Sequence, residues 1–171
     1  TVADKAADAL EDLLKDGTIA GLIMEPIICS LGVEIPTQEF MRRAQAACRK
    51  YGIECHVWKV CWNLAERAPE PFVSQMKKEG RLQATFGGKT QQSWLCPTHP
   101  ANQKLEIDSL VELARRYDIA GIHMDYIRYP GSDNCFCEGC WRRFEKSAGV
   151  TVARWPEAVR EDPGLAHQWM E

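Results

Sequence analysis

Three apolar runs that alternate with helix-like segments limit most strongly how this chain can fold. The runs lie near residues 19–27, 53–62 and 119–129. A run of this length, rich in apolar residues, is typical of a strand that is covered on both faces, as in a parallel sheet. Because parallel strands need long crossover connections, the alternation predicts a parallel sheet whose strands are joined by helices.

Helices are predicted where apolar residues recur with helical spacing. This pattern is found in residues 2–15, 37–51, 100–116 and 138–147. Residues 64–92 form a long polar excursion with one short helix near 71–79, and such a segment is usually functional or an inserted layer. Near the end of the sequence we expect a polar segment that carries Trp155 and Trp169.

The order of these elements predicts an α/β fold. Both an open doubly wound sheet and a (β/α)8 barrel are built from alternating units of this kind. A complete barrel needs roughly 200–250 residues, whereas this chain has 171 residues and three clear strands. We therefore interpret residues 1–171 as one partial (β/α) barrel domain.

The composition excludes several classes of protein. Hydrophobic residues make up 45% and charged residues 26% of the chain, which is typical of a globular domain rather than a disordered one. The net charge of −3 argues against a nucleic-acid partner bound through a broad basic surface. No apolar stretch approaches 18 residues, so no membrane span is expected. A neutral carbohydrate partner is compatible with all three observations.

Candidate site residues follow from the position of the strand ends. In parallel α/β folds, reactive side chains gather where the strands end and before helices that start on the same face. Carboxylates, aromatic rings, amides and imidazoles are the groups that a sugar site uses. The residues selected in this way are Glu25, Trp58, Trp62, Asn63, His99, His123, Asp125, Arg128 and Tyr129.

Asp125 is the strongest of these candidates for a functional residue because it interrupts an apolar strand. A lone buried carboxylate is costly unless it is paired or functional. His123 precedes it by two residues, so both side chains point to the same face of the strand. Arg128 could pair with Asp125 and keep it ionised. The alternative to catalysis is a structural ion pair at the end of the strand.

The other candidates have structural alternatives as well. His99 could cap the helix that follows it instead of binding substrate. Trp58 and Trp62 could pack in the core instead of stacking on a ligand, and Glu25 could be a surface carboxylate.

A Cys-rich loop at residues 131–140 indicates a metal site. Cys135, Cys137 and Cys140 have the short spacing of a metal knuckle, which predicts a structural zinc ion. Cys96 or His99 could supply the fourth ligand, and we predict Cys96. The alternatives are a disulfide with one free thiol, or three unrelated thiols.

Several segments resemble the glycosyl hydrolase-like family 10 proteins. Residues 117–130 read Tyr-Asp-Ile-Ala-Gly-Ile-His-Met-Asp, followed by Tyr126 and by Tyr-Pro, which is similar to the strand-four signature of that family. Residues 97–100 resemble its Pro-x-His-Pro motif. Trp58 and Asn63 resemble the strand that carries the family's Trp and Asn. The resemblance extends over about residues 1–147.

The resemblance implies a glycoside hydrolase with a TIM barrel, of which this chain would contain about strands two to four with their helices. Asp125 would then be the nucleophile or the carboxylate that stabilises the oxocarbenium ion. A second carboxyl group would act as acid/base from a later strand, so this chain alone is expected to be inactive. No catalytic cofactor is implied. Members of the family are often exported, which makes export or a periplasmic location an expectation for the full-length protein.

Two other functions stay open. One is a non-catalytic carbohydrate-binding or structural α/β domain with a zinc-stapled loop, which the cysteine cluster favours. The other is a zinc hydrolase with Cys and His ligands, which would need an open coordination position at the metal. The sequence does not indicate the oligomeric state.

Overall fold

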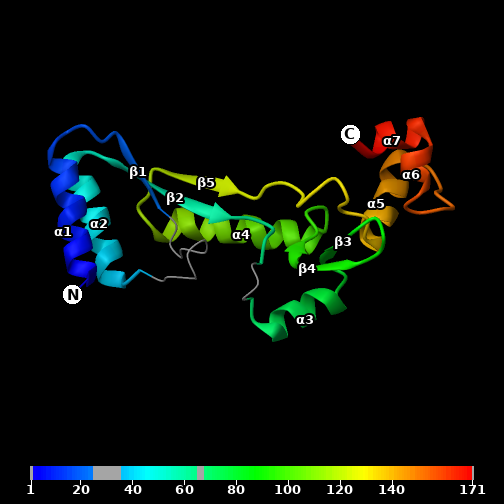
Figure 1. The fold of residues 1–171 in the computed structure, drawn as a ribbon, viewed down its shortest axis with the longest axis horizontal. Coiled ribbons are helices and arrows are strands. Elements are labelled where there is room, and N and C mark those ends of the chain that lie inside the picture. The colour runs from blue at the N-terminus through cyan, green and yellow to red at the C-terminus, as the bar shows by residue number, and fades with distance from the viewer. Residues whose placement is uncertain (1, 25–35, 65–67, 171) are drawn as a thin grey trace. The chain divides into compact units, whose positions relative to one another are not determined.

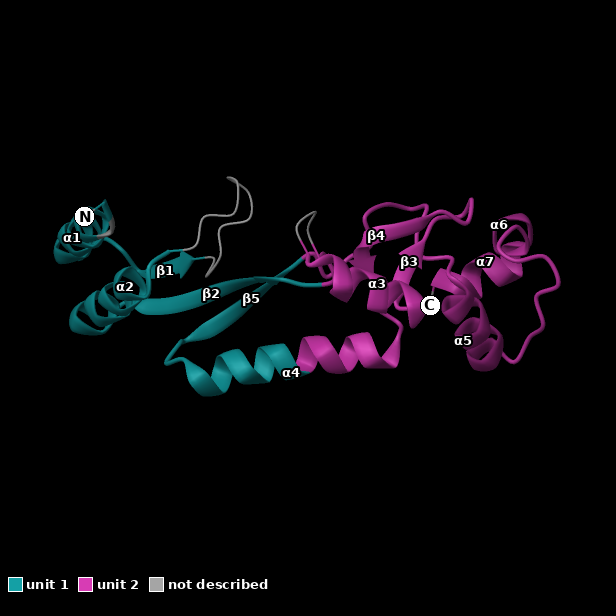
Figure 2. Ribbon diagram, turned by 90° about the horizontal axis from the view of Figure 1, so that it is seen from below, with its two compact units in different colours: residues 1–61, 108–125 teal, residues 62–107, 126–171 magenta. Residues whose placement is uncertain are grey.

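The computed structural model describes residues 2–24, 36–64 and 68–170. The chain divides into two compact units, shown in Figure 2. Unit 1 contains Thr1–Cys61 and Asp108–Asp125, and unit 2 contains Trp62–Ile107 and Tyr126–Glu171. Helix α4 (Pro100–Arg116) contributes residues to both units. None of the helices in the described ranges is long and apolar enough to cross a lipid bilayer.

Unit 1 contains the predicted parallel sheet. Its strands are β1 (Gly21–Met24), β2 (Glu54–Val60) and β5 (Gly121–Asp125), in the spatial order β1-β2-β5 (Figure 1). Both pairings are parallel, which confirms an α/β arrangement with crossover connections. Strands β2 and β5 are shorter than the apolar runs that predicted them.

The helices of unit 1 begin and end where local signals place them. They are α1 (Val2–Lys15) and α2 (Gln38–Tyr51), close to the predicted ranges. The hydroxyl of Thr37 accepts a hydrogen bond of 3.1 Å from the Phe40 amide and so caps the start of α2. Gly52 ends that helix with a φ of 66°, a conformation that glycine adopts without steric cost.

Helices α2 and α4 both lie on one face of the sheet. A cavity of about 440 Å³ is bordered by Met41 of α2, Leu113 of α4, and Cys55 and Val57 of β2. Side chains alternate along a strand, so Trp58 lies on the opposite face. Trp58 is 37% exposed. The sheet of unit 1 therefore has a helix-covered face and a second face that carries partly exposed side chains.

Unit 2 contains a hairpin that the sequence analysis missed. Strands β3 (Leu82–Ala84) and β4 (Thr90–Leu95) pair antiparallel within the segment that was expected to be a polar excursion. Both strands are short and rich in glutamine, so their composition gave little strand signal. A turn decides the pairing: the Thr85 amide donates to the Lys89 carbonyl, and Gly88 adopts a φ of 81°. The short helix predicted near 71–79 is confirmed as α3 (Glu70–Lys78).

The C-terminal part of unit 2 is not the polar segment that the sequence led us to expect. After α5 (Glu138–Ala148) come two short helices, α6 (Ala158–Glu161) and α7 (Pro163–Met170). They enclose a core built from buried aliphatic residues and aromatic rings, including Phe136, Phe144, Val152, Trp155, Val159 and Trp169. The prediction was wrong because these residues are irregularly spaced in the sequence and meet only after the chain turns back on itself.

Asn102 joins the start of α4 to the hairpin. Its side chain is fully buried, with 0% exposure. The amide nitrogen donates to the carbonyls of Arg81 (2.8 Å) and Cys96 (2.9 Å), and the amide oxygen accepts from Nε of Arg81 at 2.7 Å. One side chain therefore satisfies two backbone carbonyls and one guanidinium donor.

Replacing Asn102 with alanine should destabilise unit 2. The substitution removes three part-buried or buried hydrogen bonds, which we expect to lower the free energy of unfolding by about 2–4 kcal/mol. Urea unfolding of the purified chain measures this change. Gln103→Ala is the matched control, since Gln103 is exposed and makes one bond to the Pro97 carbonyl. Equal losses in the two variants would contradict the assigned role of Asn102.

Candidate functional site

The sheet of unit 1 places Asp125 at the carboxyl end of β5. Its side chain is half-buried, and its backbone carbonyl accepts a hydrogen bond of 2.8 Å from the Cys61 amide. The register pairs Trp58 with His123, and Val60 with Asp125. Neighbours in a parallel register project to the same face, so Trp58, His123 and Asp125 share the face opposite the helices.

Two residues that the sequence analysis missed extend this set. Nδ1 of His56 lies 3.0 Å from Nε2 of His123, and Nε2 of His56 lies 3.0 Å from the Glu54 carboxylate. A carboxylate and two imidazoles thus form a hydrogen-bonded chain along the face that carries Asp125. Glu54 and His56 lie in the first half of β2, whereas the strand-end rule selects residues only where a strand ends. Their alternation with Trp58 was the available signal.

Gly121 makes room for the His56 ring. It is the register partner of His56, and a Cβ atom at this position would lie 2.9 Å from Nδ1 of His56. That separation is too short for a carbon–nitrogen contact. The lack of a side chain at residue 121 therefore lets the imidazole lie against β5 and reach His123.

Gly121→Ala should displace His56 and break its hydrogen bond to His123. We expect both histidines to change their imidazole nitrogen shifts in long-range ¹H–¹⁵N spectra, and the overpacked strand to lose about 1–3 kcal/mol of stability. Gly131→Ala is the control, since a Cβ atom there would meet no atom within 4 Å. If the histidine spectra of the Gly121 variant match the wild type, the proposed contact does not exist in solution.

Asn63, Arg128 and Tyr129, which were also predicted, lie in unit 2. Asn63 forms an isolated bridge with Trp94. The Arg128 guanidinium lies 5.5 Å from the centre of the Tyr126 ring, and its ion pair with Asp125 stays a prediction. Tyr129 is partly exposed. Glu25 is outside the described residues.

His99 caps the helix that follows it, which was the structural alternative to substrate binding. Its Nδ1 accepts a hydrogen bond of 3.2 Å from the Ala101 amide, in the first turn of α4. Burial lowers the pKa of His99, and the nearby Arg143 lowers it further. Trp62 likewise follows its structural alternative, because its ring packs against the core formed by Met76, Leu82 and Leu95.

Unit 2 also brings four cysteines together. Cys96 follows β4, Cys135 and Cys137 precede α5, and Cys140 lies in the first turn of that helix. The four sulfur atoms lie within 4.8 Å of one another, and the residues are only 0–8% exposed. His99 is not part of this group, so the structure selects Cys96 as the fourth member. No cysteine in the described ranges is in a disulfide.

The sulfur separations suit a single metal ion. Sγ of Cys96 lies 3.5 Å from Sγ of Cys140 and 3.7 Å from Sγ of Cys137. A tetrahedral ion with metal–sulfur bonds of about 2.3 Å would separate its ligands by about 3.8 Å. The cluster can therefore hold a metal ion without rearrangement of the backbone.

Hydrogen bonds among the crowded thiols shift their pKa values in opposite directions. Hydrogen bonds from the other three thiols lower the pKa of Cys96, and hydrogen bonds from Cys135 and Cys140 lower the pKa of Cys137 to about 7. Cys135 acts as donor, and the pKa of its thiol is raised. Burial, followed by the charge on the cluster, raises the pKa of Tyr129 to about 12. The thiolate form of Cys96 is thus favoured in a buried place, where a cation would neutralise its charge.

The fold and these sites define an α/β protein with a parallel sheet, a carboxylate at a strand end and a cysteine cluster that can bind a metal. Residues 56–150, more than half of the chain, match the family described as "Glycosyl hydrolase-like 10". The chain therefore belongs to the glycosyl hydrolase-like 10 family. The matched range contains the four clustered cysteines and every predicted site residue except Glu25.

Two further similarities are limited in extent. A hypotaurine/taurine–pyruvate aminotransferase of Paracoccus denitrificans (strain Pd 1222) is 36% identical over 64 residues, which is 36% of this chain and 14% of the aminotransferase. A solved transaminase structure, the W58L variant with SMBA, aligns with a TM-score of 0.34 at 21% identity, over 67% of this chain and 34% of that one. This chain spans a small part of both proteins, and a TM-score this low does not establish a common fold.

Proposed function

We propose that this chain is part of the catalytic (β/α)8 barrel of a glycoside hydrolase that acts on a poly- or oligosaccharide. The observation that carries the proposal is the position of Asp125 at the carboxyl end of β5, on the face opposite α2 and α4. In a (β/α)8 barrel the helices cover the outer face of the sheet, and reacting groups project from the carboxyl ends of the strands. Membership of the glycosyl hydrolase-like 10 family supports this reading.

In this proposal Asp125 is the nucleophile, or the carboxylate that stabilises the oxocarbenium ion. Trp58 stacks on a sugar ring, and His123 donates a hydrogen bond to a sugar hydroxyl. The remaining proposed substrate contacts are Glu25, Asn63, Arg128, Tyr129 and Nε2 of His99, the ring nitrogen that does not accept the capping bond from Ala101. Hydrolysis also needs a second carboxyl group, about 5–5.5 Å from the first in retaining enzymes and about 6.5–9.5 Å in inverting ones.

We assign that second carboxyl group to a later strand of a longer protein. It follows that the 171 residues alone should not turn over a glycan, because one carboxylate cannot serve as both acid/base and nucleophile. Export of the longer protein is part of the same proposal.

Asp125→Asn should abolish glycan hydrolysis by the full-length protein. An amide cannot form the glycosyl–enzyme bond or offset the developing positive charge, so we expect a loss of kcat of more than about a thousandfold. Activity on a panel of polysaccharides, with folding checked by circular dichroism, measures the effect. Asp118→Asn makes the same chemical change at an exposed ion pair with Arg49 and should leave activity intact. Retention of activity in the Asp125 variant would refute the catalytic role.

A second candidate is a non-catalytic carbohydrate-binding domain. The partly exposed Trp58 on the open sheet face favours it, since aromatic rings stack on sugars whether or not hydrolysis follows. Glycan binding without turnover in the full-length protein would select this candidate. A zinc hydrolase is less well supported, because four thiolates fill the coordination sphere that a catalytic zinc ion leaves open.

For the cysteine cluster we propose a structural zinc ion held by Cys96, Cys135, Cys137 and Cys140. The sulfur separations and the closed set of four soft ligands support zinc. The ion would supply no catalytic chemistry. It would join the segment after β4 to the start of α5, beside Trp155 and Trp169.

The purified chain should contain one zinc ion, and elemental mass spectrometry measures this metal content. Cys135→Ser should lose the ion, whereas Cys48→Ser, at a buried thiol of unit 1, should keep it. A chelator should change the tryptophan fluorescence, since Trp155 and Trp169 pack against the cluster. Lowering the pH should release zinc, because protonated thiols do not bind the metal. Zinc bound equally by both variants would refute this assignment.

A further inference from the structure

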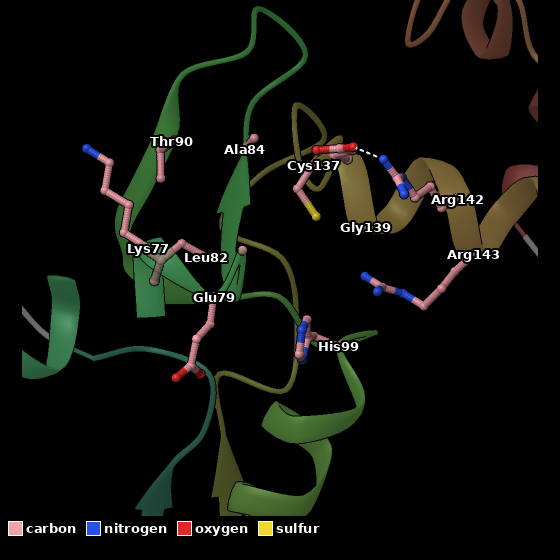
Figure 3. Close-up of a pocket in the computed structure, with 12 residues that line it drawn as sticks. Lys77, Glu79, Leu82, Ala84, Thr90, His99, Cys137, Gly139, Arg142 and Arg143 are labelled. Atoms are coloured by element: carbon pink, nitrogen blue, oxygen red, sulfur yellow. Dashed lines mark hydrogen bonds and ion pairs between the residues drawn. The ribbon is translucent and has the colours of Figure 1, made fainter. Parts of the chain in front are cut away.

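The guanidinium of Arg143 contacts the cysteine cluster directly. Nη2 of Arg143 lies 3.4 Å from Sγ of Cys96 and 3.9 Å from Sγ of Cys140. Arg143 follows Cys140 by three residues on α5, so the two side chains lie on the same side of the helix. In Figure 3 the Arg143 side chain extends from α5 toward the side of the pocket where His99 lies.

Thr98 completes the contact. Its Oγ1 accepts hydrogen bonds from Nη2 (2.9 Å) and Nε (3.1 Å) of Arg143. The same oxygen lies 3.3 Å from Sγ of Cys96 and 3.3 Å from Sγ of Cys140. Because the guanidinium occupies the lone pairs of this oxygen, the hydroxyl hydrogen is left to donate to a sulfur. Two of the four sulfurs therefore share a guanidinium and a hydroxyl donor.

Gly139 leaves room for the guanidinium of Arg143. A Cβ atom at residue 139 would lie 2.9 Å from both Nη1 and Nη2 of Arg143. Glycine is a poor helix former, yet it occupies the first turn of α5. Its presence is explained if Arg143 has to fold back over that turn to reach the sulfurs.

From these contacts we infer that Arg143, with Thr98, sets the zinc affinity of the cysteine cluster. The inference rests on the zinc ion proposed above. Zinc with four thiolates carries a net charge of −2, which is costly where the sulfurs are buried. Arg143 reduces that charge to −1 and donates to two sulfurs, and an arginine stays protonated at every relevant pH. Arg143 is a positioning residue, since it acts on the thiolates and not on a substrate.

A cavity of about 480 Å³ lies beside the cluster and is bordered by Cys137, Gly139, Arg142 and Arg143 (Figure 3). Arg142 offers a matched control on the same helix. It is exposed and pairs with the Glu138 carboxylate on the surface. A substitution at Arg142 removes the same charge from the same helix but leaves the contacts between Arg143 and the sulfurs in place.

The test compares zinc dissociation constants of the full chain, measured by competition with a chromophoric chelator. Arg143→Met removes the charge and the donors and should weaken zinc binding about 10–100-fold, as loss of a partner that hydrogen-bonds to metal ligands typically does. Arg142→Met should bind zinc like the wild type. Arg143→Lys keeps the charge without the two-point contact and should fall in between.

Cobalt provides a spectroscopic readout that a purely structural role would not move. Hydrogen bonds to thiolates lower the energy of the sulfur lone pairs, so their loss should shift the sulfur-to-cobalt charge-transfer band to longer wavelength. Gly139→Ala should produce the same direction of shift with all charges retained, because the added methyl group displaces the guanidinium. This variant also carries the test if Arg143→Met fails to fold.

The experiment distinguishes a failure of the proposed zinc site from a failure of the role assigned to Arg143. A wild-type chain that binds no zinc would refute the proposed metal site and this inference with it. A wild-type chain that binds zinc, with Arg143→Met and Gly139→Ala indistinguishable from it in affinity and cobalt spectrum, would overturn the role of Arg143 alone. Equal weakening by Arg142→Met would show a general effect of helix charge, which also contradicts the inference.

Discussion

The parallel pairing of β2 with β5 decides which side chains meet on the open face of unit 1. Its register sets His56 beside Gly121, Trp58 beside His123 and Val60 beside Asp125. A shift of one residue would turn the side chains of one strand to the helix-covered face. The hydrogen bond between His56 and His123 depends on this register and on the missing side chain of Gly121. The proposed chemistry of Asp125 depends on it as well.

Unit 2 is held together by different interactions. Its strands are short, and its buried clusters combine thiols, aromatic rings and aliphatic side chains that come from separate segments. A metal ion bound by ligands from separate segments contributes its binding energy to folding. The cysteine cluster draws its ligands from the end of β4 and from the start of α5. In the proposed function, unit 1 presents groups for carbohydrate and the thiols of unit 2 hold a structural metal ion.

Membership of the glycosyl hydrolase-like 10 family is the comparison that supports the proposal of carbohydrate chemistry. The aminotransferase similarity involves a short segment of a much longer protein, and so it does not outweigh the family match. Catalysis and binding would use the same open face of the sheet, because Trp58 and Asp125 both lie on it. What separates the two functions is a second carboxylate placed at the right distance from the first.

Local periodicity and spacing were enough to predict part of this structure. Helical repeats predicted the major helices, the apolar runs predicted three parallel strands, and alternation placed His123 and Asp125 on one face. Features that depend on residues far apart in the chain became visible only in the folded protein. The choice of Cys96 over His99 as the fourth cluster member, the meeting of His56 with His123, and the aromatic core around Trp155 and Trp169 are of this kind. Strand register and the packing of irregularly spaced side chains leave no periodic mark on a sequence, so no local pattern could predict them.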